Sequence, residues 1–356
     1  MTSYALIMAG GSGERFWPVS RVNRPKQLLK LTDPSETLLE EAVNRISPSI
    51  SKDHVLIATG LPLVDAIRAE QLIPDENVVA EPSRRNTLGC LCWAAANLMA
   101  RHPGVEDQIA VAVLTADHKI GEPDRFRRTV QTALDVAIHS GGLVTIGIRP
   151  TRPETGYGYV ELGEPVSGVS NAYRVASFRE KPDLATAEKY VSDGCLWNSG
   201  MFFWTLAGFL LELSKANQEA HQVTLDMARQ LAAGNQNAAA EEFAKLPNQS
   251  IDYALLEKSD NVYTVAADFP WDDVGAWDAL ERTLPSDDNV TVGKCLLVDC
   301  TGTIAYNDNP DMLVSAVGVE DLVIVTTKGA VMVCRKSDAQ RVKEILQELP
   351  SDSPLR

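Results

Sequence analysis

The sequence lacks any long apolar run. Nowhere among its 356 residues do roughly 18 apolar residues follow one another, the length that indicates a membrane-spanning helix. The first residues also lack a charged region followed by an apolar core and a cleavage site. Neither a transmembrane helix nor a signal peptide is therefore expected.

Cysteine and histidine are scarce. None of the six cysteines forms a Cys-x-x-Cys pair, and the five histidines are scattered. Zinc sites use closely spaced cysteines and histidines, so a histidine-based zinc site is not expected. Several of the cysteines lie in apolar runs, which is typical of buried thiols in a reducing compartment. A cytoplasmic location is predicted.

Basic residues are fewer than acidic residues. The chain has 33 Lys and Arg against 48 Asp and Glu, a formal net charge of −15. Nonspecific nucleic-acid binding needs a broad basic face, and anionic membrane surfaces also attract basic rather than acidic proteins. Neither nucleic acid nor a membrane is expected as a partner.

The few basic residues gather near the N-terminus. An apolar strand predicted at Tyr4–Met8 runs into a glycine-rich loop, and five basic residues follow with one acid, Glu14, among them: Arg15, Arg21, Arg24, Lys26 and Lys30. Glycines can take positive φ and bring backbone N–H groups close to phosphate oxygens. An arginine can fork onto such oxygens, and a lysine can act as a point charge. The loop therefore predicts an anion site, with phosphate as the suggested ligand.

Two common phosphate motifs are excluded. No Gly-Lys-Ser/Thr follows the loop, so it is not a Walker A motif. Phe16 stands where the dinucleotide fingerprint has its third glycine, which excludes a dinucleotide-dependent dehydrogenase. A plain tight turn remains the structural alternative.

The first 150 residues alternate between apolar strand-like runs and helical segments. This rhythm predicts a doubly wound α/β sheet with ligands at the carboxyl ends of its strands. The predicted strands are 4–8, 55–58, 78–80, 109–114 and 143–148, and the predicted helices are 37–46, 62–71, 87–101 and 123–139.

The remaining chain changes character twice. Short strands are predicted over 157–161, 173–178 and 201–204, as an inserted sheet region, and helices over 206–258. Strand-like runs then fill 290–334, and one amphipathic helix is predicted over 337–349. We place a domain boundary near residue 285. No internal repeat is evident in the tail.

Two acidic residues follow predicted strands. Asp117 lies just after the apolar run 109–114, and Asp273 lies in a Trp- and Gly-containing turn after the strand 262–265. Each acid can simply cap a following segment. Together they suit a Mg²⁺ ion, which takes hard oxygen ligands and usually one or two protein carboxylates.

Three further segments have a structural and a functional interpretation. Residues 81–87 can be a strand-to-helix loop in which Asn86 or Thr87 caps the helix. Residues 155–159 can be a hairpin bend, and 178–182 an exposed strand end. Their functional interpretation depends on a resemblance to a known family.

The pattern Gly-Gly-x-Gly-x-Arg-x-x-Pro over 10–18, followed by Arg-Pro-Lys-Gln over 24–27, is more specific than a glycine cluster. It resembles the N-terminal signature of the sugar-phosphate nucleotidyltransferases, and its Phe-Trp-Pro-Val-Ser-Arg version most resembles the mannose-1-phosphate guanylyltransferase (GDP-mannose pyrophosphorylase) family. The resemblance implies a Rossmann-like, doubly wound mixed sheet, the nucleotidyltransferase fold. It implies a catalytic domain over 1–285 and a small β-rich domain over 286–356 that ends in a helix.

The resemblance also implies roles for individual residues. Arg15, Lys26 and Asp117 would be catalytic, and Asp117 and Asp273 would hold Mg²⁺. The nucleotide would bind at Ala9, Gly10, Gly11, Gly13, Arg15, Lys26, Glu81, Pro82, Asn86, Thr87 and Asp117. The sugar phosphate would bind at Gly156, Tyr157, Gly158, Glu180, Lys181, Asn198 and Asp273.

The implied reaction transfers GMP from GTP to α-D-mannose 1-phosphate and gives GDP-mannose and pyrophosphate. Two alternatives stay open: a related nucleotidyltransferase with another sugar phosphate or nucleoside triphosphate, and a catalytically silent regulatory subunit. The β-rich tail is also a candidate surface for a homodimer.

Overall fold

The computed structural model describes all residues from Met1 to Arg356 and divides into two compact units. Unit 1 comprises Met1–Ala9, Val43–Thr115 and Gly121–Pro270, and unit 2 comprises Gly10–Ala42, Ala116–Ile120 and Trp271–Arg356. These units are interleaved along the chain, whereas the predicted domains, 1–285 and 286–356, are consecutive. That division stays a prediction. No helix combines the length and apolarity needed to cross a lipid bilayer.

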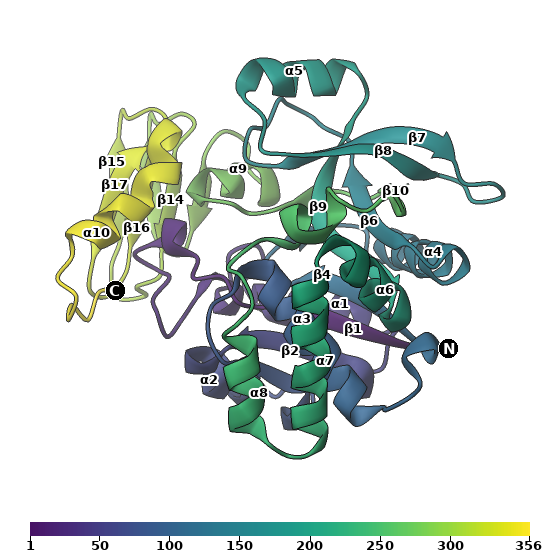
Figure 1. The fold of residues 1–356 in the computed structure, drawn as a ribbon. Coiled ribbons are helices and arrows are strands. Elements are labelled where there is room, and N and C mark those ends of the chain that lie inside the picture. The colour runs from purple at the N-terminus through teal and green to yellow at the C-terminus, as the bar shows by residue number, and fades with distance from the viewer. The chain divides into compact units, whose positions relative to one another are not determined.

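Unit 1 is built on one nine-stranded mixed sheet with the order β3-β2-β1-β4-β9-β6-β10-β8-β7 (Figure 1). Neighbours β3-β2-β1-β4 are parallel, as are β6 and β10, while β9, β8 and β7 pair antiparallel. The mixed doubly wound fold is thus confirmed. The strands are β1 (Thr2–Met8), β2 (Val55–Gly60), β3 (Val78–Glu81), β4 (Ile109–Thr115), β6 (Leu143–Ile148), β7 (Gly158–Pro165), β8 (Ala172–Glu180), β9 (Leu196–Thr205) and β10 (Val262–Ala266).

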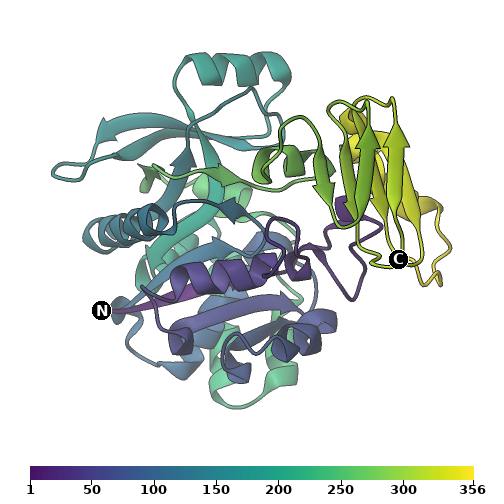
Figure 2. The same cartoon turned by 180° about the vertical axis from the view of Figure 1, so that it is seen from behind.

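Helices cover both faces of this sheet. Figure 1 shows α3, α6 and α7 in front of the strands, and Figure 2 shows α4 on the opposite face. The four helices predicted in the first 150 residues are all present. The helices are α1 (Leu38–Ile46), α2 (Val64–Ala69), α3 (Asn86–Arg101), α4 (Pro123–Ser140), α5 (Leu184–Ser192), α6 (Leu206–Ala216), α7 (Gln218–Ala232) and α8 (Gln236–Phe243), and a π-helical turn spans Asp252–Leu256.

Local signals explain where several of these helices begin and end. Asp183 and Thr205 accept backbone N–H bonds at the starts of α5 and α6. Pro123 occupies the first position of α4, and Gly141 ends it with a φ of 64°. Side-chain acceptors, an initial proline and a left-handed terminal glycine are the usual helix boundaries.

One prediction about the sheet was wrong. The strands around 157–204 do not form a separate inserted sheet, because β7, β8 and β9 belong to the main sheet. β9 lies between β4 and β6 and pairs with both. Its Phe202 and Trp204 rings stack at 6.0 Å, and Trp204 stacks on Phe209 at 4.9 Å. The strand is therefore at the centre of the unit 1 core.

Unit 2 contains short β-strands in three small sheets. In Figure 2 the strands of the chain's last third, in green to yellow, run side by side. Pairs β12–β14, β14–β16 and β13–β15 are parallel, which is the pattern of successive coils of a β-solenoid. The strands are β5 (Lys119–Ile120), β11 (Trp271–Asp272), β12 (Val290–Val292), β13 (Cys295–Val298), β14 (Ile304–Asn307), β15 (Val314–Val317), β16 (Leu322–Thr326) and β17 (Val331–Arg335).

The end of unit 2 differs from the single helix predicted over 337–349. A 3₁₀ helix spans Lys336–Glu344, and only Ile345–Glu348 (α10) is α-helical. Ala339 and Val342 are the buried residues of the first segment. Because side chains three residues apart line up in a 3₁₀ helix, this spacing suits the tighter geometry.

Trp277 lies at the centre of the unit 2 core. Its side chain is fully buried, its ring contacts Phe16 at 5.1 Å and Tyr306 at 5.0 Å, and its Nε1 donates to the Trp17 carbonyl at 3.0 Å. It therefore joins the segment after the glycine-rich loop to the C-terminal strands.

We expect Trp277→Ala to lower the free energy of unfolding by about 3–5 kcal/mol, because it leaves a cavity among aromatic side chains. Trp277→Phe should cost less but still destabilise, because the Trp17 carbonyl loses its donor. Chemical unfolding followed by circular dichroism measures both effects. Val331→Ala, at a residue 60% exposed on β17, is the control and should change stability by no more than about 0.5 kcal/mol. A Trp277→Ala variant as stable as this control would contradict the assigned role.

Candidate active site

The glycine-rich loop begins where β1 ends and packs on Lys26. Gly13 has a φ of +63°, and a Cβ there would overlap the Lys26 Cβ and lie 2.8 Å from its backbone nitrogen. Glycine is therefore required at position 13 for both conformation and space. Nothing lies within 4 Å of where a Cβ on Gly11 would be, and Arg15 is exposed. The loop thus offers open backbone and an accessible cation.

Ala9 has a different role from the glycines that follow it. Its backbone N–H donates to the Ala58 carbonyl at 2.8 Å, and its carbonyl accepts from Thr59 Oγ1 at 3.0 Å. Both bonds extend the contact with β2 within unit 1. Ala9 therefore fixes the start of the loop.

Lys26 brings the two predicted acids together. Its Nζ donates to Asp117 Oδ2 at 2.9 Å and to the Asp273 backbone carbonyl at 2.7 Å. The lysine is only 6% exposed, so its charge is compensated mainly by these oxygens. The predicted association of Lys26, Asp117 and Asp273 is therefore present within unit 2.

Asp117 is held in its ionised form. Burial alone would raise its pKa, but the nearby charges of Lys26 and His118 outweigh burial and lower the pKa below its usual value. His118 is oriented by Trp271, whose Nε1 lies 3.1 Å from His118 Nδ1. The pairing of β5 with β11 places these two side chains close together.

The turn at Asp273 is strained. Val274 has a φ of +48°, an outlier for a β-branched residue, and is fully buried. A Cβ on Gly275 would lie 3.0 Å from Asp273 Oδ2, so the carboxylate packs against that glycine. Non-glycine residues at positive φ also occur at Asn86 and Lys181, two other predicted site positions. Such strain is typical of functional sites.

The donors in this cluster fit a hard divalent cation. The ionised Asp117 carboxylate and the Asp273 residue beside it supply hard oxygen atoms, which are the ligands that Mg²⁺ takes, and the Lys26 ammonium compensates part of their negative charge. No group of three or more His, Cys, Asp or Glu that could hold a metal occurs in the structure. Magnesium is usually held by only one or two protein carboxylates together with substrate oxygens and water.

The segment predicted to bind the base follows β3 in unit 1. Burial raises the pKa of Glu81 to about 7, and a hydrogen bond from the Cys90 thiol opposes the shift only partly. Asn86 Oδ1 accepts from the Thr87 backbone N–H at 2.8 Å. Helix α3 starts after Arg85 without a side-chain cap, so neither Asn86 nor Thr87 caps it.

Thr87 contacts a distant segment of unit 1. Its Oγ1 accepts from the Ile251 backbone N–H at 2.8 Å. The hydroxyl therefore supports the chain just before the π-helical turn, a contact that the sequence did not indicate. Pro82 lies in the loop that connects β3 to α3.

Six of the seven residues predicted to bind the sugar phosphate lie in unit 1, and the seventh, Asp273, lies in unit 2. A Cβ on Gly158 would overlap Glu180 Oε2 and lie 3.4 Å from the Asn198 Cβ. Lys181 Nζ is 2.7 Å from Glu180 Oε1, and the Lys181 backbone N–H donates to the Tyr157 carbonyl at 3.2 Å. The ends of β7, β8 and β9 supply this cluster, and Gly156 belongs to the bend before β7.

The sequence did not identify one acid in this cluster. Asn198 Nδ2 donates to Asp252 Oδ1 at 3.1 Å. Asp252 lies within the stretch 206–258 predicted as helical, away from any strand end, so no local signal marked it. Its place in a π-helical turn is typical of functional positions.

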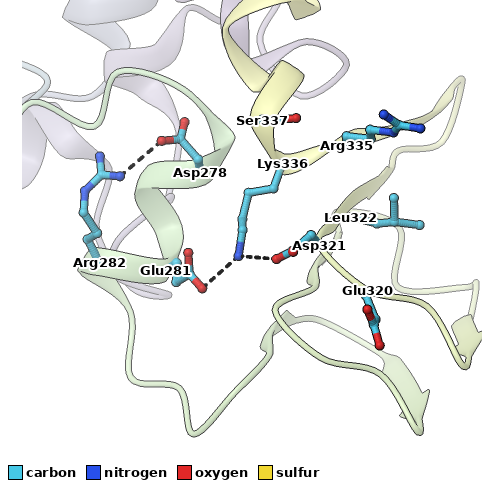
Figure 3. A pocket seen from close by; sticks show the side chains of 9 residues that line it. All are labelled: Asp278, Glu281, Arg282, Glu320, Asp321, Leu322, Arg335, Lys336 and Ser337. Atoms are coloured by element: carbon cyan, nitrogen blue, oxygen red, sulfur yellow. Dashed lines mark hydrogen bonds and ion pairs between the residues drawn. The ribbon is translucent and has the colours of Figure 1, made fainter. Parts of the chain in front are cut away.

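An open pocket of about 650 Å³ in unit 2 contains none of the predicted residues. Figure 3 shows Lys336 between Glu281 and Asp321, both at 3.0 Å, and Arg282 paired with Asp278 at 3.1 Å. These charges compensate one another. The pocket is thus lined by ion pairs that connect α9 (Leu280–Thr283) with residues next to the C-terminal strands.

Two family models match the chain. Residues 4–289 match the nucleotidyl transferase family, and residues 293–349 match a family described as the MannoseP isomerase/GMP-like beta-helix domain. The second match agrees with the parallel coils of unit 2.

Similar proteins cover nearly the whole chain. A mannose-1-phosphate guanylyltransferase of Escherichia coli is 36% identical over 97% of this chain and 75% of its own length. Mannose-1-phosphate guanylyltransferase ManC of Salmonella typhimurium is 35% identical over 98% of this chain and 73% of its own. A crystal structure from Thermus thermophilus, described as a mannose-1-phosphate geranyltransferase, has a TM-score of 0.87 and 34% identity over 98% of this chain and 99% of its own.

A more distant structure shares the fold alone. A UDP-glucose pyrophosphorylase complexed with UDP-glucose has a TM-score of 0.52 and 14% identity, with 80% of this chain and 97% of its own covered. The family match over residues 4–289 and the 36% identity to the Escherichia coli enzyme, by contrast, identify the family. The chain belongs to the nucleotidyl transferase family, among the mannose-1-phosphate guanylyltransferases.

Proposed function

We propose that this enzyme transfers GMP from GTP to α-D-mannose 1-phosphate and releases pyrophosphate. The observation that carries the proposal is the Lys26 ammonium held between Asp117 and Asp273 beside a glycine-rich loop. This arrangement suits phosphoryl chemistry because it provides positive charge, open backbone N–H groups and ionised oxygen ligands together.

The reaction needs no covalent enzyme intermediate. An oxygen of the sugar phosphate attacks the α-phosphorus of GTP in line, and pyrophosphate leaves. Catalysis then depends on positioning and charge stabilisation. The amides of Gly10, Gly11 and Gly13 bind the β- and γ-phosphates together with Arg15. Lys26 uses two of its three N–H donors within the protein and offers the third to the α-phosphate.

Asp117 and Asp273 are the residues that would hold Mg²⁺. When bound, the ion supplies Lewis-acid stabilisation of negative charge at the α-phosphate. The lowered pKa of Asp117 keeps this carboxylate available for a cation at neutral pH.

The second cluster binds the acceptor substrate. Glu180, Asn198 and the backbone at Gly156–Gly158 hydrogen-bond the sugar hydroxyls. Lys181 is 60% exposed and orients the nucleophilic phosphate by its charge. Glu81 accepts hydrogen bonds from the guanine N1–H and amino group, with Pro82, Asn86 and Thr87 shaping the loop around the base.

Two further proposals concern the setting of the enzyme. All six cysteines are free, which suits a reducing compartment such as the cytoplasm. The apolar side chains of Leu296, Val298 and Val317 are exposed on β13 and β15 and offer a surface for a homodimer.

The deciding experiment measures pyrophosphate release with α-D-mannose 1-phosphate and Mg²⁺, with each of GTP, ATP, UTP, CTP and dTTP. We expect release with GTP alone. Release with another nucleotide would keep the chemistry but contradict the assignment of Glu81 to guanine. Silence with every nucleotide, followed by release with a different sugar phosphate, would identify a relative with another acceptor. Silence throughout would favour a regulatory subunit.

Lys26→Ala and Asp117→Ala should each lower turnover by about a hundredfold or more, the scale of losing one electrostatic stabiliser. Steady-state kinetics measures the loss, and melting temperatures confirm that the variants fold. Lys30→Ala is the matched control: this lysine follows the same loop but is exposed and donates to the Ser35 carbonyl. Near-normal turnover in both Lys26 and Asp117 variants would contradict the roles assigned to them.

Glu81→Gln should lower kcat/KM for GTP about tenfold or more, because an amide offers one acceptor and a competing donor to guanine. The pKa of about 7 adds a pH dependence: as pH falls, protonation turns one of the two acceptor oxygens of Glu81 into a donor, which mismatches the guanine donors. The KM for GTP should therefore rise roughly tenfold from about pH 8 to about pH 6 in the native enzyme.

This rise should be absent in Glu81→Gln. Glu76→Gln, an exposed carboxyl in the same unit, should behave like the native enzyme. If the KM of Glu81→Gln for GTP rose with falling pH as it does in the native enzyme, another group would bind the base.

A further inference from the structure

The Asp252 carboxylate can accept a further hydrogen bond. The Asn198 amide bonds one of its oxygens, Oδ1, at 3.1 Å, and the Ser250 hydroxyl and the residue's own backbone N–H also interact with the carboxylate, which has about four acceptor sites. The residue begins the π-helical turn, and the Glu257 backbone N–H returns to the Asp252 carbonyl at 2.9 Å. The Thr87 hydroxyl holds the start of this turn at the Ile251 N–H. The carboxylate is therefore positioned by backbone contacts on both sides.

Asn198 can act only as a donor toward a ligand. Its Oδ1 accepts from the Gly200 backbone N–H at 3.2 Å and from Thr145 Oγ1 at 2.7 Å. A backbone N–H only donates, so this contact fixes which side of the amide is the oxygen. One Nδ2 hydrogen goes to Asp252. The second hydrogen remains for a ligand oxygen.

The charges around Asp252 favour ligands that donate. Burial, followed by the neighbouring charge of Glu180, raises the pKa of Asp252 to about 6, although the Ser250 hydroxyl and the Lys181 charge oppose the shift. The Asp252 carboxylate is then mainly ionised near neutral pH and accepts hydrogen bonds only. The Lys181 ammonium bonds Glu180 and is largely exposed, so it compensates only part of this negative charge. Hydroxyl groups, which donate without adding negative charge, suit the acceptors of Asp252 and Glu180.

The cluster is closely packed. A Cβ at position 158 would overlap Glu180 Oε2, and the Asn198 Cβ would lie 3.4 Å from it, so glycine lets the carboxylate pack against the backbone. The Tyr157 and Trp197 rings meet edge to face at 5.1 Å beside it. Acceptors from two carboxylates and a donor from one amide thus lie close together beside the Gly158 backbone.

We propose that Asp252 is a specificity-determining residue of the sugar site, whose Oδ2 accepts a hydrogen bond from one hydroxyl of the hexose while Asn198 Nδ2 donates to the neighbouring hydroxyl. Because this acceptor and this donor lie side by side, they can bind two adjacent hydroxyls of the sugar together only when those hydroxyls have one relative configuration. The inference rests on the proposed function, because it takes a hexose 1-phosphate as the ligand.

The test compares native enzyme and Asp252→Asn with α-D-mannose 1-phosphate and its 2-, 3-, 4- and 6-deoxy analogues. Asparagine keeps the size of the side chain and the acceptor for Asn198 but removes the charge. With the full sugar, the variant should raise the KM for the sugar phosphate about tenfold to a hundredfold and leave the KM for GTP unchanged. For one deoxy analogue, the native enzyme and the variant should have the same KM.

That single analogue identifies the hydroxyl that Asp252 binds. A uniform loss with every analogue would mean that Asp252 acts only through structure and would overturn the inference. So would an unchanged KM for the full sugar. Asp260→Asn is the matched control, since this exposed carboxyl follows the same turn outside the cluster and should leave all constants unchanged. Melting temperatures show whether the variants fold.

Failure of the proposed function gives a different result. If the native enzyme uses another sugar 1-phosphate instead of mannose 1-phosphate, that function falls, and the same comparison with deoxy forms of the accepted sugar still decides the role of Asp252. If the native enzyme uses none, both proposals are overturned.

Discussion

The buried ammonium of Lys26 is the constraint on which the candidate phosphate site depends. A lysine almost excluded from water must have its charge compensated, and here Asp117 and the Asp273 carbonyl do so at 2.9 and 2.7 Å. The Lys26 Nζ atom thereby joins three stretches of unit 2 that are far apart in the sequence, those around Lys26, Asp117 and Asp273. Gly13 must remain glycine because the loop packs on the Lys26 backbone. The strained turn at Val274 persists because the carbonyl before it is engaged.

Much of this arrangement could be predicted from local patterns. The apolar runs of β1 and β4 are long enough to indicate buried parallel strands, and an acid or a glycine loop just after such a strand indicates a site. Register confirms that β1 and β4 end together, with Met8 opposite Thr115. The sugar cluster was found through family resemblance, because Glu180 and Asn198 belong to antiparallel strands whose partners no local pattern specifies.

What the sequence could not indicate was set by tertiary contacts. Asp252 is an acid in a stretch of helical composition, and only the Asn198 contact shows its relevance. The coils of the tail escaped detection because they are uneven: β12, β14 and β16 begin at Val290, Ile304 and Leu322, so no fixed period repeats. The 3₁₀ geometry after Lys336 follows from the burial of Ala339 and Val342, which a helical period does not distinguish over so short a stretch.

The position of β9 has a consequence for biosynthesis. This strand, Leu196–Thr205, fills the gap between β4 and β6, which are both made earlier on the ribosome. Until it emerges, β4 and β6 each present an unpaired, apolar edge, which is the kind of surface that promotes aggregation. The four early strands β3-β2-β1-β4 can pair with one another, but their sheet keeps an open edge at β4 until β9 is made. Unit 1 must complete its sheet late, when a strand from the second half of the unit enters between two strands of the first.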